Sequence, residues 1–136
     1  MSEKKMMAEG AWVVVADGHG ARVLVNRGKQ DEPALSEREK LGPKDLLSEG
    51  PAGSRPQGDS PRDTDEATFA KQLATWLYEQ AHKGAYQQLI LAADPTTLGQ
   101  IRPQLHKEVQ SRLHGEVAKT LTHATPAEIL RSVTAG

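Results

Sequence analysis

The chain has 136 residues, which is the size of one ordinary domain with a single hydrophobic core. Its 17 Lys and Arg residues are balanced by 18 Asp and Glu residues, and the formal charge of −1 excludes a strongly basic nucleic-acid binder and an acidic tail, though not a local basic face. The absence of cysteine excludes disulfides, thiol nucleophiles and thiolate metal sites.

Neither a membrane span nor a secretion signal is predicted. The apolar run at residues 11–16 is six residues long, whereas a signal peptide needs an apolar stretch of about 7–15 residues and a membrane span about 20. We therefore expect a cytoplasmic protein without membrane insertion. Residues 1–10 are expected to form a flexible tail, and residues 11–136 a single domain.

The first part of that domain is predicted to be a meander of strands. Residues 11–16 are apolar and β-branched, which is typical of a buried strand. Asp17-Gly18 is a strong hairpin signal because glycine accepts positive φ and aspartate tolerates it, so residues 21–26 form the returning strand. The charged segment 35–41 is ambiguous between helix and strand, and we interpret it as an edge strand.

Residues 42–62 are predicted to form one long loop, because glycine and proline recur there and no apolar period runs through it. Loops of this length inside a compact domain are uncommon and are usually functional or disordered.

A helix is predicted next, capped by Thr64 or Asp65, with an apolar face through residues 69–77 and an end at Gly84. The apolar residues 89–93 then form a second buried strand.

Four further elements are predicted in the C-terminal third. Asp94 caps a short helix through Ile101, and a longer helix follows over residues 103–115, with Leu105, Val109 and Leu113 on one face. Residues 117–121 form the last strand. Thr125 caps a final helix, with Glu128 in the capping-box position. The order β-β-(β)-α-β-α-β-α indicates an α/β fold of the ribonuclease-H-like class, a mixed sheet flanked by helices.

Metal-dependent catalysis is one candidate function. Asp17 and Asp94 each follow a buried strand, and Glu66 or Glu79 on the long helix could complete a two-metal nuclease site. A turn explains Asp17 and a helix cap explains Asp94, and we give these structural explanations more weight than a metal site. The predicted helix separates His106 from His114 by about 12 Å, which is too far for one zinc ion. No metal or cofactor is expected.

Binding to RNA through a glycine-rich loop is the other candidate. The loop combines small residues, an amide and guanidinium groups that suit phosphate, at Gly53, Ser54, Arg55, Gln57 and Arg62. Basic residues exceed acidic ones in the C-terminal third, where Arg102, Lys107 and Lys119 could form a face for RNA. A mobile surface loop and a solvated mixed surface are the simpler explanations.

Several sequence blocks resemble the bacterial host-attachment protein family, whose relatives include the middle domain of the archaeal and eukaryotic class-one release factor and of Pelota. The blocks keep their order and are WVVVADG from Trp12, ARVL from Ala21, LSEGPAGSR from Leu47, FAKQL from Phe69, LILAADP from Leu89, LGQIR from Leu98, KTLTH from Lys119 and PAEIL from Pro126.

The resemblance implies a ribonuclease-H-like fold and an indirect role in bacterial attachment to host cells. It also implies a module that contacts RNA, the ribosome or a protein partner through the loop ahead of the long helix. Release factors carry Gly-Gly-Gln in that loop, whereas this chain has Pro56-Gln57-Gly58. Because proline forbids the backbone geometry that paired glycines allow, we expect binding and not peptidyl-tRNA hydrolysis.

Overall fold

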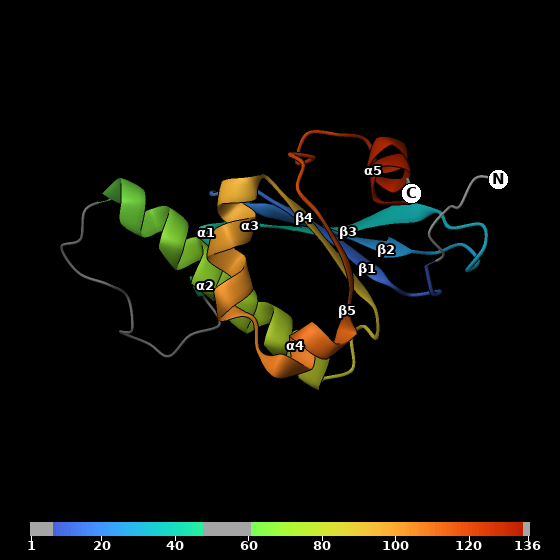
Figure 1. The fold of residues 1–136 in the computed structure, drawn as a ribbon, viewed down its shortest axis with the longest axis horizontal. Coiled ribbons are helices and arrows are strands. Elements are labelled where there is room, and N and C mark those ends of the chain that lie inside the picture. Colours follow the sequence, from blue (N-terminus) through green and yellow to red (C-terminus); the bar gives the residue numbers. More distant parts are fainter. Residues whose placement is uncertain (1–6, 48–60, 135–136) are drawn as a thin grey trace.

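The structure is a computed structural model, and it describes residues 7–47 and 61–134, with the side chains of Leu47 and residues 61–66 left aside. Within these ranges the chain forms a five-stranded sheet in the order β3-β2-β1-β4-β5, with helices on both faces (Figure 1). None of the described helices combines the length and apolar character that crossing a bilayer requires.

The sheet is mixed, and only one of its strands runs against the others. β1 (Trp12–Ala16) and β2 (Ala21–Asn26) form an antiparallel hairpin, and β3 (Leu35–Leu41) pairs with the other side of β2. β4 (Leu89–Ala93) and β5 (Leu113–Val117) then extend the sheet in parallel from β1. The predicted ribonuclease-H-like fold is confirmed, and residues 35–41 form the predicted edge strand.

The helices divide unequally between the two faces of the sheet. On one, which we call the α2 face, lie α1 (Pro43–Leu47), α2 (Pro61–His82), α3 (Pro95–Ile101), the 3₁₀ helix η1 (Arg102–Gln104) and α4 (Lys107–Arg112). On the other, the α5 face, α5 (Pro126–Thr134) packs with the segment before it (Figure 1).

Alternation along the strands supplies both apolar layers, because successive side chains of a strand point to opposite faces. Val14 of β1 faces Leu73 and the rest of α2, whereas Val13 and Val15 join Ile129 of α5. All five residues of β1 are buried, as the continuous apolar run predicts for a strand covered on both sides.

Aromatic packing fixes α2 against the sheet. The Trp12 ring lies 5.6 Å from the Trp76 ring and 4.8 Å from the Tyr86 ring, measured between centroids. The Tyr86 hydroxyl donates to the Leu77 carbonyl at 2.8 Å, and burial raises the pKa of Tyr86. The few bulky residues of the chain are therefore concentrated on the α2 face.

The predicted loop 42–62 is wrong at both ends. Residues 43–47 form α1, because proline suits the first helical position and Asp45 Oδ2 accepts from the Gly42 amide at 2.7 Å. α2 begins at Pro61, ahead of the predicted caps Thr64 and Asp65. Residues 48–60 lie outside the described part of the chain.

The predicted helix 103–115 is confirmed only at residues 107–112, and the strand predicted at 117–121 lies at 113–117 instead. The backbone becomes extended at Leu105, α4 restarts after His106 and ends at Arg112, and β5 occupies Leu113–Val117. The spacing of Leu105, Val109 and Leu113 fits a helix, but pairing with β4 draws Leu113 into the sheet. His106 and His114 therefore share no helix face.

Candidate functional site

A polar pocket of about 330 Å³ lies at the carboxyl ends of β1 and β3. Four segments build it: the β1–β2 turn, the start of β2, the passage from β3 into α1, and the chain between β5 and α5. Its lining residues are Asp17, Gly20, Ala21, Arg22, Lys40, Leu41, Gly42, Asp45, Thr122 and His123. Both signs of charge line one cavity.

Asp17 shapes the turn on one side of the polar pocket. Its Oδ1 accepts from the backbone amides of His19 at 2.8 Å and Gly20 at 2.9 Å, and its own amide donates to the Gly20 carbonyl at 2.9 Å. The hairpin prediction is confirmed, but its stated reason is not. Gly18 does not adopt positive φ, so the aspartate side chain and not glycine geometry closes the turn.

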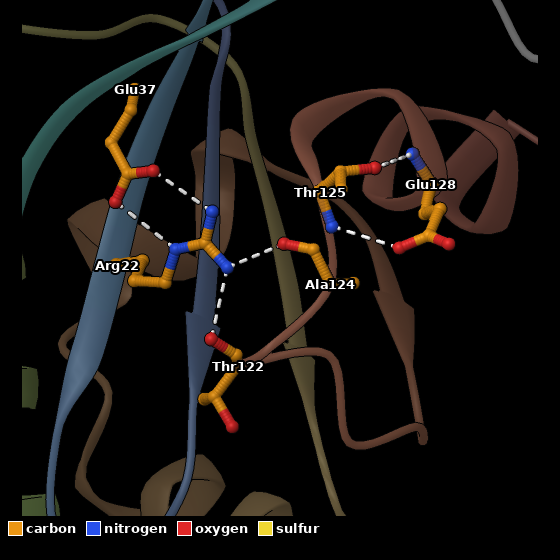
Figure 2. A network of polar contacts seen from close by, with 6 residues as sticks. All are labelled: Arg22, Glu37, Thr122, Ala124, Thr125 and Glu128. Atoms are coloured by element: carbon orange, nitrogen blue, oxygen red, sulfur yellow. Dashed lines mark hydrogen bonds and ion pairs between the residues drawn. The ribbon is translucent and has the colours of Figure 1, made fainter.

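Arg22 also lines the polar pocket, and its side chain clamps the chain segments around it (Figure 2). Its Nε and Nη2 donate to the two carboxylate oxygens of Glu37 at 3.0 and 2.8 Å. Its Nη1 donates to the carbonyls of Thr122 at 2.9 Å and Ala124 at 2.7 Å. A single side chain of β2 thus ties β3 to the segment that leads into α5.

The Arg22–Glu37 pair is only partly shielded from water, because 12% of the arginine side chain but 29% of the glutamate side chain is exposed. The hydrogen bonds from Arg22 lower the pKa of Glu37, and partial burial opposes them less strongly.

The clamped segment runs directly into the predicted capping box of α5. The Glu128 amide donates to Thr125 Oγ1 at 3.1 Å, and the Thr125 amide donates to Glu128 Oε1 at 2.9 Å (Figure 2). The bond from the Thr125 amide is the main reason that the pKa of Glu128 is lowered. The capping-box prediction is confirmed, and it fixes the entry of α5 next to Arg22.

The Thr122 hydroxyl is a buried polar group of this region, and it has no hydrogen-bond partner among the described residues. Figure 2 shows it pointing away from Arg22, while the Thr122 carbonyl points toward the guanidinium. Buried hydroxyls nearly always have a partner, so Thr122 is an exception among the described residues.

The predicted RNA-binding residues are placed only in part. Gly53, Ser54, Arg55 and Gln57 lie outside the described residues, and Arg62 belongs to the first turn of α2 without a described side chain.

The predicted residues of the C-terminal third are all exposed. Arg102 pairs with Glu116, with Nη2 and Oε1 2.6 Å apart, and this hydrogen-bonded pair raises the pKa of Arg102. Lys107 begins α4, and Lys119 follows β5. These three cations come from successive elements, and none of them lines the polar pocket.

The alternative metal-binding residues are brought to one edge of the sheet. Ala16 pairs with Ala93 in parallel register, so Asp17 and Asp94 leave adjacent strands at the same end. Asp94 caps α3, with Oδ2 accepting from the Thr97 amide at 3.1 Å and Oδ1 from the Thr97 hydroxyl at 2.7 Å. Burial raises the pKa of Asp94, but these bonds together outweigh it and lower that pKa.

No group of three His, Cys, Asp or Glu residues that could hold a metal ion occurs in the described part of the chain. The Glu66 side chain lies outside that part, and Glu79 stands on α2. His106 instead caps α4, accepting from the Glu108 amide at 3.0 Å, and its ring stacks on Tyr78 with centroids 4.0 Å apart.

The sequence pattern points to Asp17 but not to the other charged groups of the polar pocket, Arg22, Lys40 and Asp45. One signal was present: Arg22 interrupts the apolar run of β2, and a charge at such a position needs a partner. The identity of that partner depends on strand pairing.

Comparison with known proteins gives one family and several distant structures. The family model described as Bacterial archaeo-eukaryotic release factor family 12 matches residues 10–133. No curated protein matches.

Two solved structures are similar, an archaeal protein at 13% identity with a TM-score of 0.47 and an archaeal translation termination factor, aRF1, at 12% identity with a TM-score of 0.46. The matches cover 90% and 89% of this chain but only 35% and 36% of those chains, so this chain spans about a third of their length.

Proposed function

The chain belongs to the bacterial archaeo-eukaryotic release factor family 12, and from this membership we propose that it is a non-enzymatic binding domain that contacts RNA, free or within the ribosome. The loop residues Gly53, Ser54, Arg55, Gln57 and Arg62 form one contact, and Arg102, Lys107 and Lys119 form the other. The cytoplasm is the compartment in which such a partner is met.

The observation that carries the proposal is a pair of exposed lysines that are unpaired among the described residues, one at the start of α4 and one just after β5. Lys107 and Lys119 are exposed, and neither forms an ion pair with another described residue. Arg102 is also exposed, so its charge is only partly offset by Glu116. Free surface cations are the groups that displace counterions from a phosphate backbone.

Binding of the purified chain to ribosomes and to structured RNA, measured by filter binding over a range of salt concentrations, tests the proposal. For every phosphate that K107Q/K119Q no longer neutralises, the slope of log affinity against log salt is expected to become shallower by about 0.7–0.9. A second variant, R55Q/R62Q, tests the loop in the same way.

Two exposed lysines elsewhere, Lys29 and Lys71, provide the matched control, and K29Q/K71Q is expected to leave the slope unchanged. The proposal fails if micromolar protein shows no salt-sensitive binding to either RNA, or if the control variant weakens binding as much as K107Q/K119Q does.

A metal-dependent nuclease is the second candidate function, supported by the register that carries Asp17 and Asp94 to one edge of the sheet. The measurement is RNA cleavage with Mg²⁺ or Mn²⁺, comparing the parent chain with D94N. Cleavage abolished in D94N would favour this candidate over simple binding.

The resemblance to host-attachment proteins adds a cellular role, an indirect contribution to attachment exerted from inside the cell. Cell fractionation checks the location, and recovery of the protein on the outer surface would contradict it.

A further inference from the structure

We propose that the polar pocket binds a small zwitterion of the amino-acid class, with the ligand ammonium at Asp17 and the ligand carboxylate at Lys40. This site is separate from the proposed RNA contacts, and none of its residues belongs to them.

The position of the polar pocket favours a ligand. The pocket lies where β1 and β3 end and the antiparallel β2 begins, and polar side chains from separate elements converge there. Its volume of about 330 Å³ is at the lower end of the range for small-molecule sites, which suits a compact ligand.

Asp17 provides the contact for a cation. The two backbone bonds that shape the turn both end on Oδ1, and no hydrogen bond from a described residue reaches Oδ2. The carboxylate is therefore held in place by one oxygen while the other can accept from an ammonium group. A preorganised charged acceptor of this kind forms stronger hydrogen bonds than a neutral one.

Lys40 provides the contact for an anion. Arg22 lies opposite Lys40 in the β2–β3 ladder and opposite Val15 in the β1–β2 ladder, so all three side chains project to the α5 face. The Arg22 guanidinium is already paired with Glu37, whereas Lys40 forms no ion pair with another described residue. Lys40 is thus the cation of this wall that can receive a carboxylate.

The spacing of the strands suits a ligand with both charges. Adjacent strands are about 4.8 Å apart, which places β1 and β3 about 10 Å apart. Asp17 follows β1 and Lys40 lies on β3, and both line the same pocket, so a compact zwitterion can be contacted from the two sides of β2. The carboxylates of Asp17 and Asp45 would repel a simple anion, and the ammonium group of Lys40 would repel a simple cation.

Titration of the full chain, followed by amide shifts in two-dimensional NMR, tests the proposal. The probes are the standard L-amino acids, one at a time, and the deaminated and decarboxylated analogues of each binder. We expect saturable shifts centred on the amides of Gly20, Gly42 and Thr122. Binding should be weaker by about tenfold or more for either analogue, since each analogue lacks one of the two charge-assisted hydrogen bonds.

Two variants separate the ligand contacts from the fold. D17N keeps an acceptor oxygen for the turn but removes the charge, and K40M keeps the length of the side chain. Each is expected to weaken binding about tenfold or more while retaining a native NMR spectrum. D31N and K29M, in the exposed turn between β2 and β3, are the matched controls and should bind as the parent does.

Three outcomes would overturn the proposal. They are the absence of saturable shifts with any amino acid at about 10 mM, equal binding of one of the single-charge analogues, and shifts centred away from the polar pocket. Because these probes contain no nucleic acid, failure here leaves RNA binding unaffected, and loss of RNA binding leaves this site unaffected.

Discussion

The two faces of the sheet are covered in different ways. On the α2 face, five helical segments and an aromatic cluster bury a large apolar layer, and within the described residues Tyr86 is the one aromatic hydroxyl buried there. On the α5 face, one helix of nine residues and the segment before it form the cover. Directional contacts from Arg22 and the Thr125–Glu128 box hold that cover in place.

The difference shows that a thin layer of apolar packing can be compensated by polar contacts. The compensation makes the α5 face sensitive to pH and to single polar substitutions, because a hydrogen bond depends on one donor and one acceptor. The α2 face spreads its stabilisation over many contacts and depends on side-chain volume. The following predictions separate these two modes of stabilisation.

The largest expected effect is on the α2 face. Trp12→Ala removes a ring that is 2% exposed and contacts two other aromatic residues, and it should lower the free energy of unfolding by about 3–5 kcal/mol. Urea denaturation followed by circular dichroism measures the decrease. A decrease below about 1 kcal/mol would mean that the aromatic cluster does not anchor α2.

Arg22→Gln is the corresponding test of the α5 face. It breaks the pair with Glu37 and leaves the carbonyls of Thr122 and Ala124 without their donor, so the free energy of unfolding should fall by about 2–3 kcal/mol. Amide exchange should rise most in α5. Equal loss of protection on both faces would contradict a separate polar clamp.

Arg102→Gln is the matched control for that substitution. Arg102 also pairs with a glutamate, but 55% of its side chain is exposed and no carbonyl of the described chain accepts from it. Because exposed ion pairs contribute little, the unfolding transition should not move measurably.

The capping box should contribute less than Arg22. Thr125→Ala removes the acceptor of the Glu128 amide and should lower the free energy of unfolding by about 1 kcal/mol. The same denaturation experiment measures it, and Thr125→Ser, which keeps the hydroxyl, should retain most of the stability.

Acid should affect the α5 face through Glu37. Its pKa is lowered by the hydrogen bonds from Arg22, so the pair stabilises the fold fully above the ordinary value of 4.5, and this stabilisation is lost as the pH falls through the lowered pKa. As the pH is lowered from above 4.5 through the lowered pKa of Glu37, the denaturation midpoint of the parent chain should fall. The midpoint of Glu37→Gln should fall less steeply over the same pH range. Parallel curves would exclude Glu37 as the titrating group.

Much of the fold was predictable because its signals are local. The continuous apolar strands at residues 12–16 and 89–93, the cap at Asp94 and the box formed by Thr125 and Glu128 each depend on neighbours within a few residues. The order of strands and helices then limited the class of fold. β5 was missed because its partly exposed residues carry little pattern of their own.

The polar pocket required the tertiary structure. Arg22 and Thr122 are 100 residues apart in the chain, and only the pairing of β2 with β3 and the return of the chain toward α5 bring them into contact. The sequence by itself determined the local elements, since turns, caps and apolar periods are set by short-range sterics and hydrogen bonding. Which charges meet across the sheet was decided by strand register, because register selects the partners of every side chain on each face.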